Sequence, residues 1–209
     1  KGVPGIKSVY EDSVVYTTMD ASNSLINSDA AWQALGGQDA AGKGINVAII
    51  DTGIDFEHLM FADNGHDAVI VETEAGEDFC AANEGICNDK IAIARYYDVP
   101  SSVHPEEFFD SPWDMNGHGT HVAGTAAGNP VSVTYNGVAM NMSGVAPGAT
   151  LFVYKALWNT ADGRGSGVTS ALAEALEDAA MDGAHVINNS WGGNTGAHPS
   201  TSPYQTIMQ

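Results

Sequence analysis

Basic residues are scarce in this chain of 209 residues. Seven lysines and arginines stand against 26 aspartates and glutamates, which gives a formal net charge of −19. Binding to phosphates needs a basic face, so this balance argues against a nucleic-acid partner. Long apolar runs are also missing: none approaches the roughly 20 residues of a membrane span, and we expect no membrane partner. The acidity is typical of a soluble, secreted protein that tolerates salt.

Cysteine is scarce as well, because the chain has only Cys80 and Cys87. They lie in an acidic, glycine-containing loop, close enough in sequence to form a short disulfide hairpin in an oxidising compartment. Two free thiols remain the alternative. A disulfide here would agree with an extracellular location.

The apolar residues, 44% of the chain, suffice for one folded core. Short apolar runs alternate with amphipathic or small-residue segments, which predicts strands that alternate with helices. Strands are expected at 45–50, 90–97, 151–154 and 184–189, and helices at 29–35 with Ser28 as N-cap, at 118–127, and at 168–181 with an end at Gly183. This order implies right-handed parallel crossovers. The expected fold is of the α/β class, with three layers: a mostly parallel sheet and helices on both faces.

An aspartate follows the first of these strands. Residues 45–50, Ile-Asn-Val-Ala-Ile-Ile, form a short and mostly apolar run of the kind that buried parallel strands show, and Asp51 comes next. Functional residues of open α/β sheets gather beyond the carboxyl ends of the strands, which is where this order places Asp51. Gly53 then lets the chain turn without a Cβ clash.

A histidine stands in a second motif, Asn-Gly-His-Gly-Thr-His-Val-Ala-Gly at residues 116–124. His118 lies in a glycine-flanked turn that opens a helix of small residues. A serine hydroxyl attacks at neutral pH only if an imidazole takes its proton, and a buried carboxylate has to orient that imidazole. We assign His118 the role of general base and Asp51 the role of orienting carboxylate. We predict that the two side chains meet across the top of the sheet.

Both motifs resemble those around the catalytic aspartate and histidine of the subtilisin-like serine peptidases (subtilases, peptidase family S8). Residues 186–193, Val-Ile-Asn-Asn-Ser-Trp-Gly-Gly, are similar to the family's segment that lines the primary specificity pocket, and residues 144–149 to its lead into the next core strand. The resemblance implies a serine endopeptidase that works through an acyl-enzyme and needs no cofactor for catalysis. The family's oxyanion asparagine and nucleophilic serine would follow Gln209. The chain is therefore expected to supply Asp51 and His118 but no nucleophile, and to be inactive alone.

The resemblance also divides the chain. Residues 1–18 resemble the tail of the family's inhibitory propeptide, which implies a zymogen; an ordinary amino-terminal strand is the alternative. Residues 14–18 would lie in the substrate cleft like a product, with self-cleavage near residues 18–19. Residues 19–209 would be the N-terminal portion of the catalytic domain, with an acidic insertion at about 60–112 that accounts for the long interval between the two motifs.

The partners implied are a protein or peptide substrate and the chain's own propeptide. A peptide substrate is held as an extended strand, with main-chain hydrogen bonds along an edge and pockets for alternate side chains. One wall is expected at Gly165, Ser166 and Gly167, and the other at Ser190, Trp191 and Gly192. The glycines of the first segment fit a plain turn before a helix equally well.

Two other functions stay open. His118 and His121 are three positions apart and could ligate a metal in a metal-dependent hydrolase, although no glutamate stands between them as in the common zinc-protease helix. Alternatively, the full protein has lost its nucleophile and serves as a subtilase-like binding module. No metal is assigned to catalysis. A structural Ca²⁺ is compatible with an acidic loop that nevertheless lacks the spacing of a defined calcium loop. Its acidic residues are Glu72, Glu74, Glu77, Asp78, Glu84 and Asp89.

Overall fold

A four-stranded parallel sheet forms the centre of the computed structural model, which describes residues 19–63, 65 and 78–192. The register pairs Asn46 with Thr150 and Asp51 with Lys155 along the two central strands. This arrangement confirms the expected α/β fold and brings the carboxyl ends of those strands side by side. From one edge to the other the strands are β2 (Ile91–Tyr96), β5 (Thr150–Lys155), β1 (Asn46–Asp51) and β8 (Val186–Asn188).

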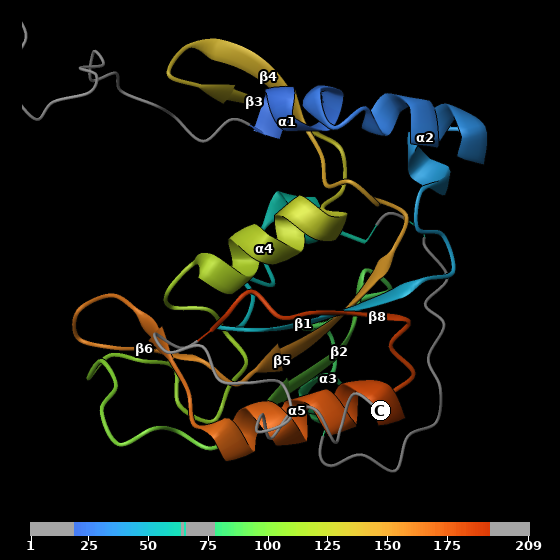
Figure 1. Cartoon of the computed structure of the whole chain (residues 1–209). Coiled ribbons are helices and arrows are strands. Elements are labelled where there is room, and N and C mark those ends of the chain that lie inside the picture. Colours follow the sequence, from blue (N-terminus) through green and yellow to red (C-terminus); the bar gives the residue numbers. More distant parts are fainter. Residues whose placement is uncertain (1–18, 64, 66–77, 193–209) are drawn as a thin grey trace, which may run out of the picture.

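Helices cover both faces of this sheet (Figure 1). Helix α4 (His118–Ala127) lies on one face and α5 (Thr169–Met181) on the other. Because β1 is buried on both faces, its sequence is apolar without alternation. Alternate side chains of β1 pack in the cluster under α4 (Val47, Ile49) and in the cluster under α5 (Ala48, Ile50).

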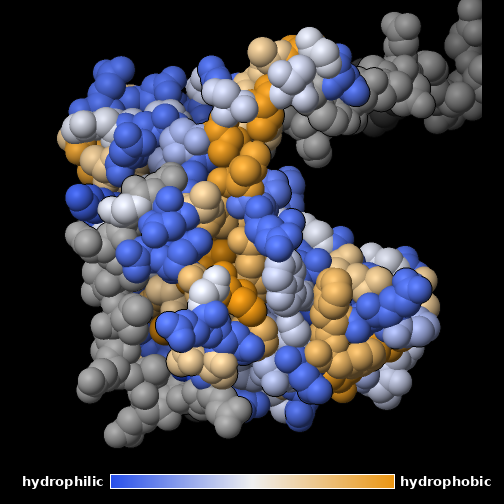
Figure 2. All heavy atoms as spheres, turned by 180° about the vertical axis from the view of Figure 1, so that it is seen from behind, coloured by the Kyte–Doolittle hydropathy of each residue, from blue (hydrophilic) through white to orange (hydrophobic). Residues whose placement is uncertain are grey.

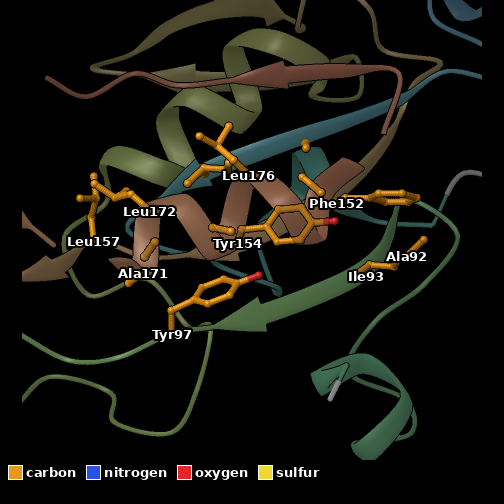
Figure 3. Close-up of a cluster of buried hydrophobic side chains, with 14 residues drawn as sticks. Ala92, Ile93, Tyr97, Phe152, Tyr154, Leu157, Ala171, Leu172 and Leu176 are labelled. Atoms are coloured by element: carbon orange, nitrogen blue, oxygen red, sulfur yellow. The ribbon is translucent and has the colours of Figure 1, made fainter. Parts of the chain in front are cut away.

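The cluster under α5 holds a polar network inside its apolar surroundings. Figure 3 shows Phe152 and Tyr154 of β5 beside Leu176 of α5. The hydroxyl of Tyr154 donates to Oδ2 of Asp182 over 2.7 Å, and Nε of Arg95 donates to the same oxygen over 2.8 Å. Buried polar groups need such partners, since an unpaired one costs stability. The network thus joins β2, β5 and the end of α5.

Smaller elements surround this core. We predicted helix α2 (Ser28–Leu35). We predicted neither helix α1 (Met19–Leu25) nor the hairpin of β3 (Val131–Tyr135) and β4 (Val138–Met142). One detail was wrong: Asn27 caps α2, and Ser28 is already the first helical residue. The tight passage from α1 to α2 puts the backbone of Asn27 at φ 61°, a conformation that asparagine adopts more readily than most residues. The elements are α1 (Met19–Leu25), α2 (Ser28–Leu35), η1 (Gln38–Ala40), η2 (Leu59–Phe61), α3 (Phe79–Ala82), β3 (Val131–Tyr135), β4 (Val138–Met142), β6 (Trp158–Asn159) and β7 (Gly165–Ser166).

A disulfide joins Cys80 to Cys87. Cys80 lies in α3, and the N-cap residue of that helix, Asp78, accepts hydrogen bonds from the N–H groups of Cys80 and of Ala94 in β2, each over 3.0 Å. Both cysteines also pack against the cluster under α4. The bridge therefore lies where the described part of the acidic insertion is fastened to the edge strand β2.

The surface is largely hydrophilic on the face seen in Figure 2, where hydrophobic residues form a band between polar groups. Exposed apolar side chains include Leu25 of α1, Leu35 of α2 and Val138 of β4. Within the described ranges, no helix combines the length and apolar character that a membrane crossing requires. The expected propeptide tail at residues 1–18 lies outside the described residues.

Candidate active site

A carboxylate lies buried at the carboxyl end of a central strand. Asp51 is the last residue of β1, which extends one position beyond the strand end that we predicted, and its side chain is 0% exposed. Its Oδ1 accepts a hydrogen bond from the N–H of Thr52 over 2.7 Å. Burial raises the pKa of Asp51, while the hydrogen bond to His118 acts in the opposite direction. The acid is held in one position and shielded from water.

The imidazole of His118 reaches this carboxylate. His118 is the first residue of α4, and Nδ1 of its ring lies 2.7 Å from Oδ1 of Asp51. The side chain of His118 is 48% exposed, in contrast to the buried acid. The hydrogen bond to Asp51 therefore fixes the Nδ1 side of the ring, and the rest of the ring remains accessible to a reacting group.

Two glycines allow close packing around the strand end: Gly119 of α4 against the backbone of Gly53, and Gly53 against the segment that precedes the helix. A Cβ on Gly119 would lie 2.3 Å from the carbonyl oxygen of Gly53. Gly53 has φ 107°, and a Cβ there would lie 2.3 Å from the carbonyl oxygen of Pro112. Real Cβ atoms do not tolerate such distances, so a larger residue at position 119 would push α4 away from the end of β1, and one at position 53 would displace the segment at Pro112. The close packing expected from the small residues of the histidine motif is thus observed.

Asp114 holds the turn that precedes His118, a role that we did not predict. Its carboxylate accepts hydrogen bonds from the backbone N–H groups of Asn116 and Gly117, each over 2.9 Å, and therefore holds the turn that precedes His118. Aspartate side chains commonly hold turns in this way, and an aspartate two residues before an Asn-Gly pair was the available signal.

A buried ion pair supports the loop that leads into Asp114. Lys155 is the last residue of β5 and pairs in register with Asp51. Its Nζ donates to Oε1 of Glu107 over 3.0 Å and to the carbonyl oxygen of Trp113, and both charged side chains are buried. Burial lowers the pKa of Lys155, and Glu107 opposes that effect. The pair anchors residues 107–113 to the end of the central sheet.

A cleft of about 650 Å³ opens beside His118. Leu157 and Leu172 provide apolar surface in it, and Thr52, the residue that follows Asp51, also lines it. All six residues that we predicted to contact substrate line this cleft together with His118. They are Gly165, Ser166, Gly167, Ser190, Trp191 and Gly192.

The first predicted wall is more than a plain turn. Gly165 and Ser166 form β7, which pairs antiparallel with Trp158 and Asn159 of β6. Asn116, two residues before His118, links this wall to the histidine turn: its Nδ2 donates to Oδ1 of Asn159 over 2.9 Å and to the carbonyl oxygen of Gly163 over 3.0 Å. The base and the wall of the cleft are thus connected by one side chain that we did not predict.

Metal ligands are not grouped in the part of the chain that the structure describes. No set of three or more histidine, cysteine, aspartate or glutamate side chains there has an arrangement that could hold an ion. His118 and His121 therefore belong to no set of three such side chains among these residues. Of the acidic loop on which the calcium expectation rests, Glu72, Glu74 and Glu77 lie outside the described residues, while Asp78, Glu84 and Asp89 lie within them and belong to no such set.

Comparison with known proteins agrees with the geometry. Residues 42–209 match the model of the subtilase family. Subtilisin-like protease SBT2.1 of Arabidopsis thaliana is 36% identical over 169 residues, which cover 76% of this chain and 20% of that protein. Subtilisin-like protease SBT2.6 of the same plant is 31% identical over 209 residues, which cover 92% of this chain and 24% of that protein.

The chain belongs to the subtilase family. The resemblance drawn from the sequence motifs is confirmed. The chain spans about a fifth of the length of the curated relatives it matches.

Proposed function

We propose that the full-length protein is a subtilisin-type serine endopeptidase, for which this chain supplies Asp51 as the orienting acid and His118 as the general base. The distance of 2.7 Å between Nδ1 of His118 and Oδ1 of Asp51 carries the proposal. It joins a fully buried carboxylate to a half-exposed imidazole beside a cleft. This is the arrangement that activation of a weak hydroxyl nucleophile requires.

His118 works through its two ring nitrogens. Nδ1–H donates to Asp51, which fixes the tautomer and leaves Nε2 to accept the proton of the serine hydroxyl as that oxygen attacks the peptide carbonyl. The imidazolium then donates this proton to the leaving amine, and an acyl-enzyme remains for hydrolysis by water. Asp51 stabilises the imidazolium without taking the proton. The serine and the oxyanion asparagine belong to segments outside this chain.

The substrate is an extended protein or peptide segment. A peptide lying along β7 would place its backbone beside Gly165 and Gly167, where the absence of side chains permits close approach. Leu157 and Leu172 offer apolar contact to one of its side chains, and residues 190–192 form the opposite wall. The disulfide in the insertion favours a secreted enzyme, because such bridges persist in oxidising compartments. Residues 1–18 act as the end of an inhibitory propeptide.

Replacement of His118 by alanine in the full-length protein tests the proposal. The variant should lose peptide hydrolysis and propeptide processing together, and also labelling of a serine by a fluorophosphonate. The wild-type protein should be labelled equally with and without chelator. Processing at the normal rate in the variant would overturn the assignment, and a folded wild-type protein without labelling would favour the binding-module alternative.

A further inference from the structure

We infer that Asp114 is a positioning residue for the catalytic pair: its carboxylate ties the side chain of the residue that follows Asp51 to the backbone of the residue that precedes His118. This inference rests on the proposed function. Oδ1 of Asp114 accepts from the hydroxyl of Thr52 over 2.9 Å and from the N–H of Gly117 over 2.9 Å. Thr52 directly follows Asp51, and Gly117 directly precedes His118. A single oxygen thus connects the two segments whose relative position sets the 2.7 Å contact.

The second oxygen of Asp114 extends the connection into the helix. Oδ2 accepts from the N–H of Thr120 over 2.9 Å and from its hydroxyl over 2.6 Å. The hydroxyl of Thr120 in turn accepts from the N–H of Asp55 over 3.0 Å. The first turn of α4 is therefore bound both to Asp114 and to the loop that leaves β1.

Thr52 closes the same network from the strand side. Its hydroxyl accepts from the N–H of Gly119 over 2.8 Å while it donates to Asp114. The hydrogen bonds of Thr52 and Asp114 thus connect the end of β1 to the start of α4. Loss of Asp114 would leave three backbone N–H groups and two hydroxyls without their common acceptor.

The chemistry of the site requires a carboxylate at position 114. Five donors converge on its two oxygens, and only an ionised acid offers acceptor sites on both of them. An asparagine would point an NH₂ group at donors on one side. Asp114 is not one of the described residues that line the cleft. We therefore expect it to affect catalysis through the position of His118 and not through contact with substrate.

The test is Asp114→Asn in the full-length protein, with Asp110→Asn as a control that removes the same charge from the same loop without a bond to α4. Asp114→Asn should lower kcat by about 10²-fold, the effect of a small misplacement of a reacting group, and leave KM unchanged. In the proton NMR spectrum, the low-field signal of the His118 imidazole N–H bonded to Asp51 should broaden or vanish. Asp110→Asn should change neither quantity.

A second pair of variants covers the case in which Asp114→Asn does not fold. Thr120→Val removes the hydroxyl and should reproduce both effects in weaker form, whereas Thr120→Ser keeps the hydroxyl and should behave like the wild type. A folded variant that keeps the low-field signal unchanged overturns the positioning role, whatever its activity. Since the NMR signal needs no nucleophile, it decides the inference even if the protein proves to hydrolyse no peptide.

Discussion

Nδ1 of His118 lies 2.7 Å from Oδ1 of Asp51, and the two side chains differ in exposure, 48% against 0%. The difference matters because the acid must hold the ring without competition from water, while the ring must meet a hydroxyl that arrives from the cleft. The strand provides the buried position and the helix terminus provides the open one. The contact exists only because β1 ends where α4 begins.

Asp51→Asn should lower kcat by about 10⁴-fold, since an amide no longer favours the tautomer that leaves Nε2 free to accept a proton. The fold should remain, and thermal stability at pH 7 should be equal or higher. Burial raises the pKa of Asp51 above its unfolded value, so the ionised form costs stability at neutral pH and this cost disappears as the pH falls through the raised pKa. Kinetics and thermal unfolding at several pH values measure both effects. The exposed acid Asp39 offers the control, Asp39→Asn, and normal turnover of Asp51→Asn would contradict the orienting role.

His121→Ala should leave peptide hydrolysis within about twofold of the wild type, because His121 is an exposed residue of α4 with no part in the proposed mechanism. Chelator should have no effect on the rate of either protein. The matched comparison is His118→Ala on the same helix. If His121→Ala and chelator both abolished activity, the metal-dependent hydrolase would replace the serine peptidase as the preferred mechanism.

Asn116→Asp should raise KM for extended peptides by about tenfold or somewhat more. The change turns a donor to Oδ1 of Asn159 and to the carbonyl oxygen of Gly163 into an oxygen that repels both, and two neutral hydrogen bonds contribute about 1 kcal/mol each. Steady-state kinetics on a peptide series separate KM from kcat. Asn136→Asp, in the exposed turn between β3 and β4, is the control for the added charge. An unchanged KM would show that the wall of the cleft does not depend on this link.

Lys90 should make stability rise with pH above neutrality. Its ammonium group is buried, donates to the carbonyl oxygens of Pro147 and Ala149, and has a pKa lowered by burial to about 7. Between pH 7 and the ordinary lysine pKa the unfolded chain binds more protons, so the free energy of unfolding should increase across that range. Lys90→Met should remove this slope, whereas Lys43→Met at an exposed position should retain it. Parallel slopes in the two variants would refute the prediction.

The alternation of apolar runs and small-residue segments predicted the α/β fold, because a strand buried on both faces must be apolar throughout. The two short motifs predicted which acid and which imidazole would meet, since the ends of parallel strands lie at one edge of a sheet. Gly53 and Gly119 carry part of that information locally, as they mark the close approach of α4 to β1. Helix α1 escaped prediction because it is short, whereas the β3–β4 hairpin carried a signal that we overlooked: Val131, Val133 and Tyr135 alternate with polar residues before the turn dipeptide at 136–137.

The amino-acid sequence by itself determined the class of fold, the identities of Asp51 and His118, and the segments that line the cleft. Only the tertiary structure decided that Asp114 holds both sides of the catalytic pair and that Asn116 joins the base to the wall of the cleft. The physical reason is that both residues form hydrogen bonds to groups far away in the chain: Asp114 to the hydroxyl of Thr52, and Asn116 to residues 159 and 163. Such bonds depend on how loops are placed after the sheet and helices have packed, and a local pattern of residues does not encode that placement.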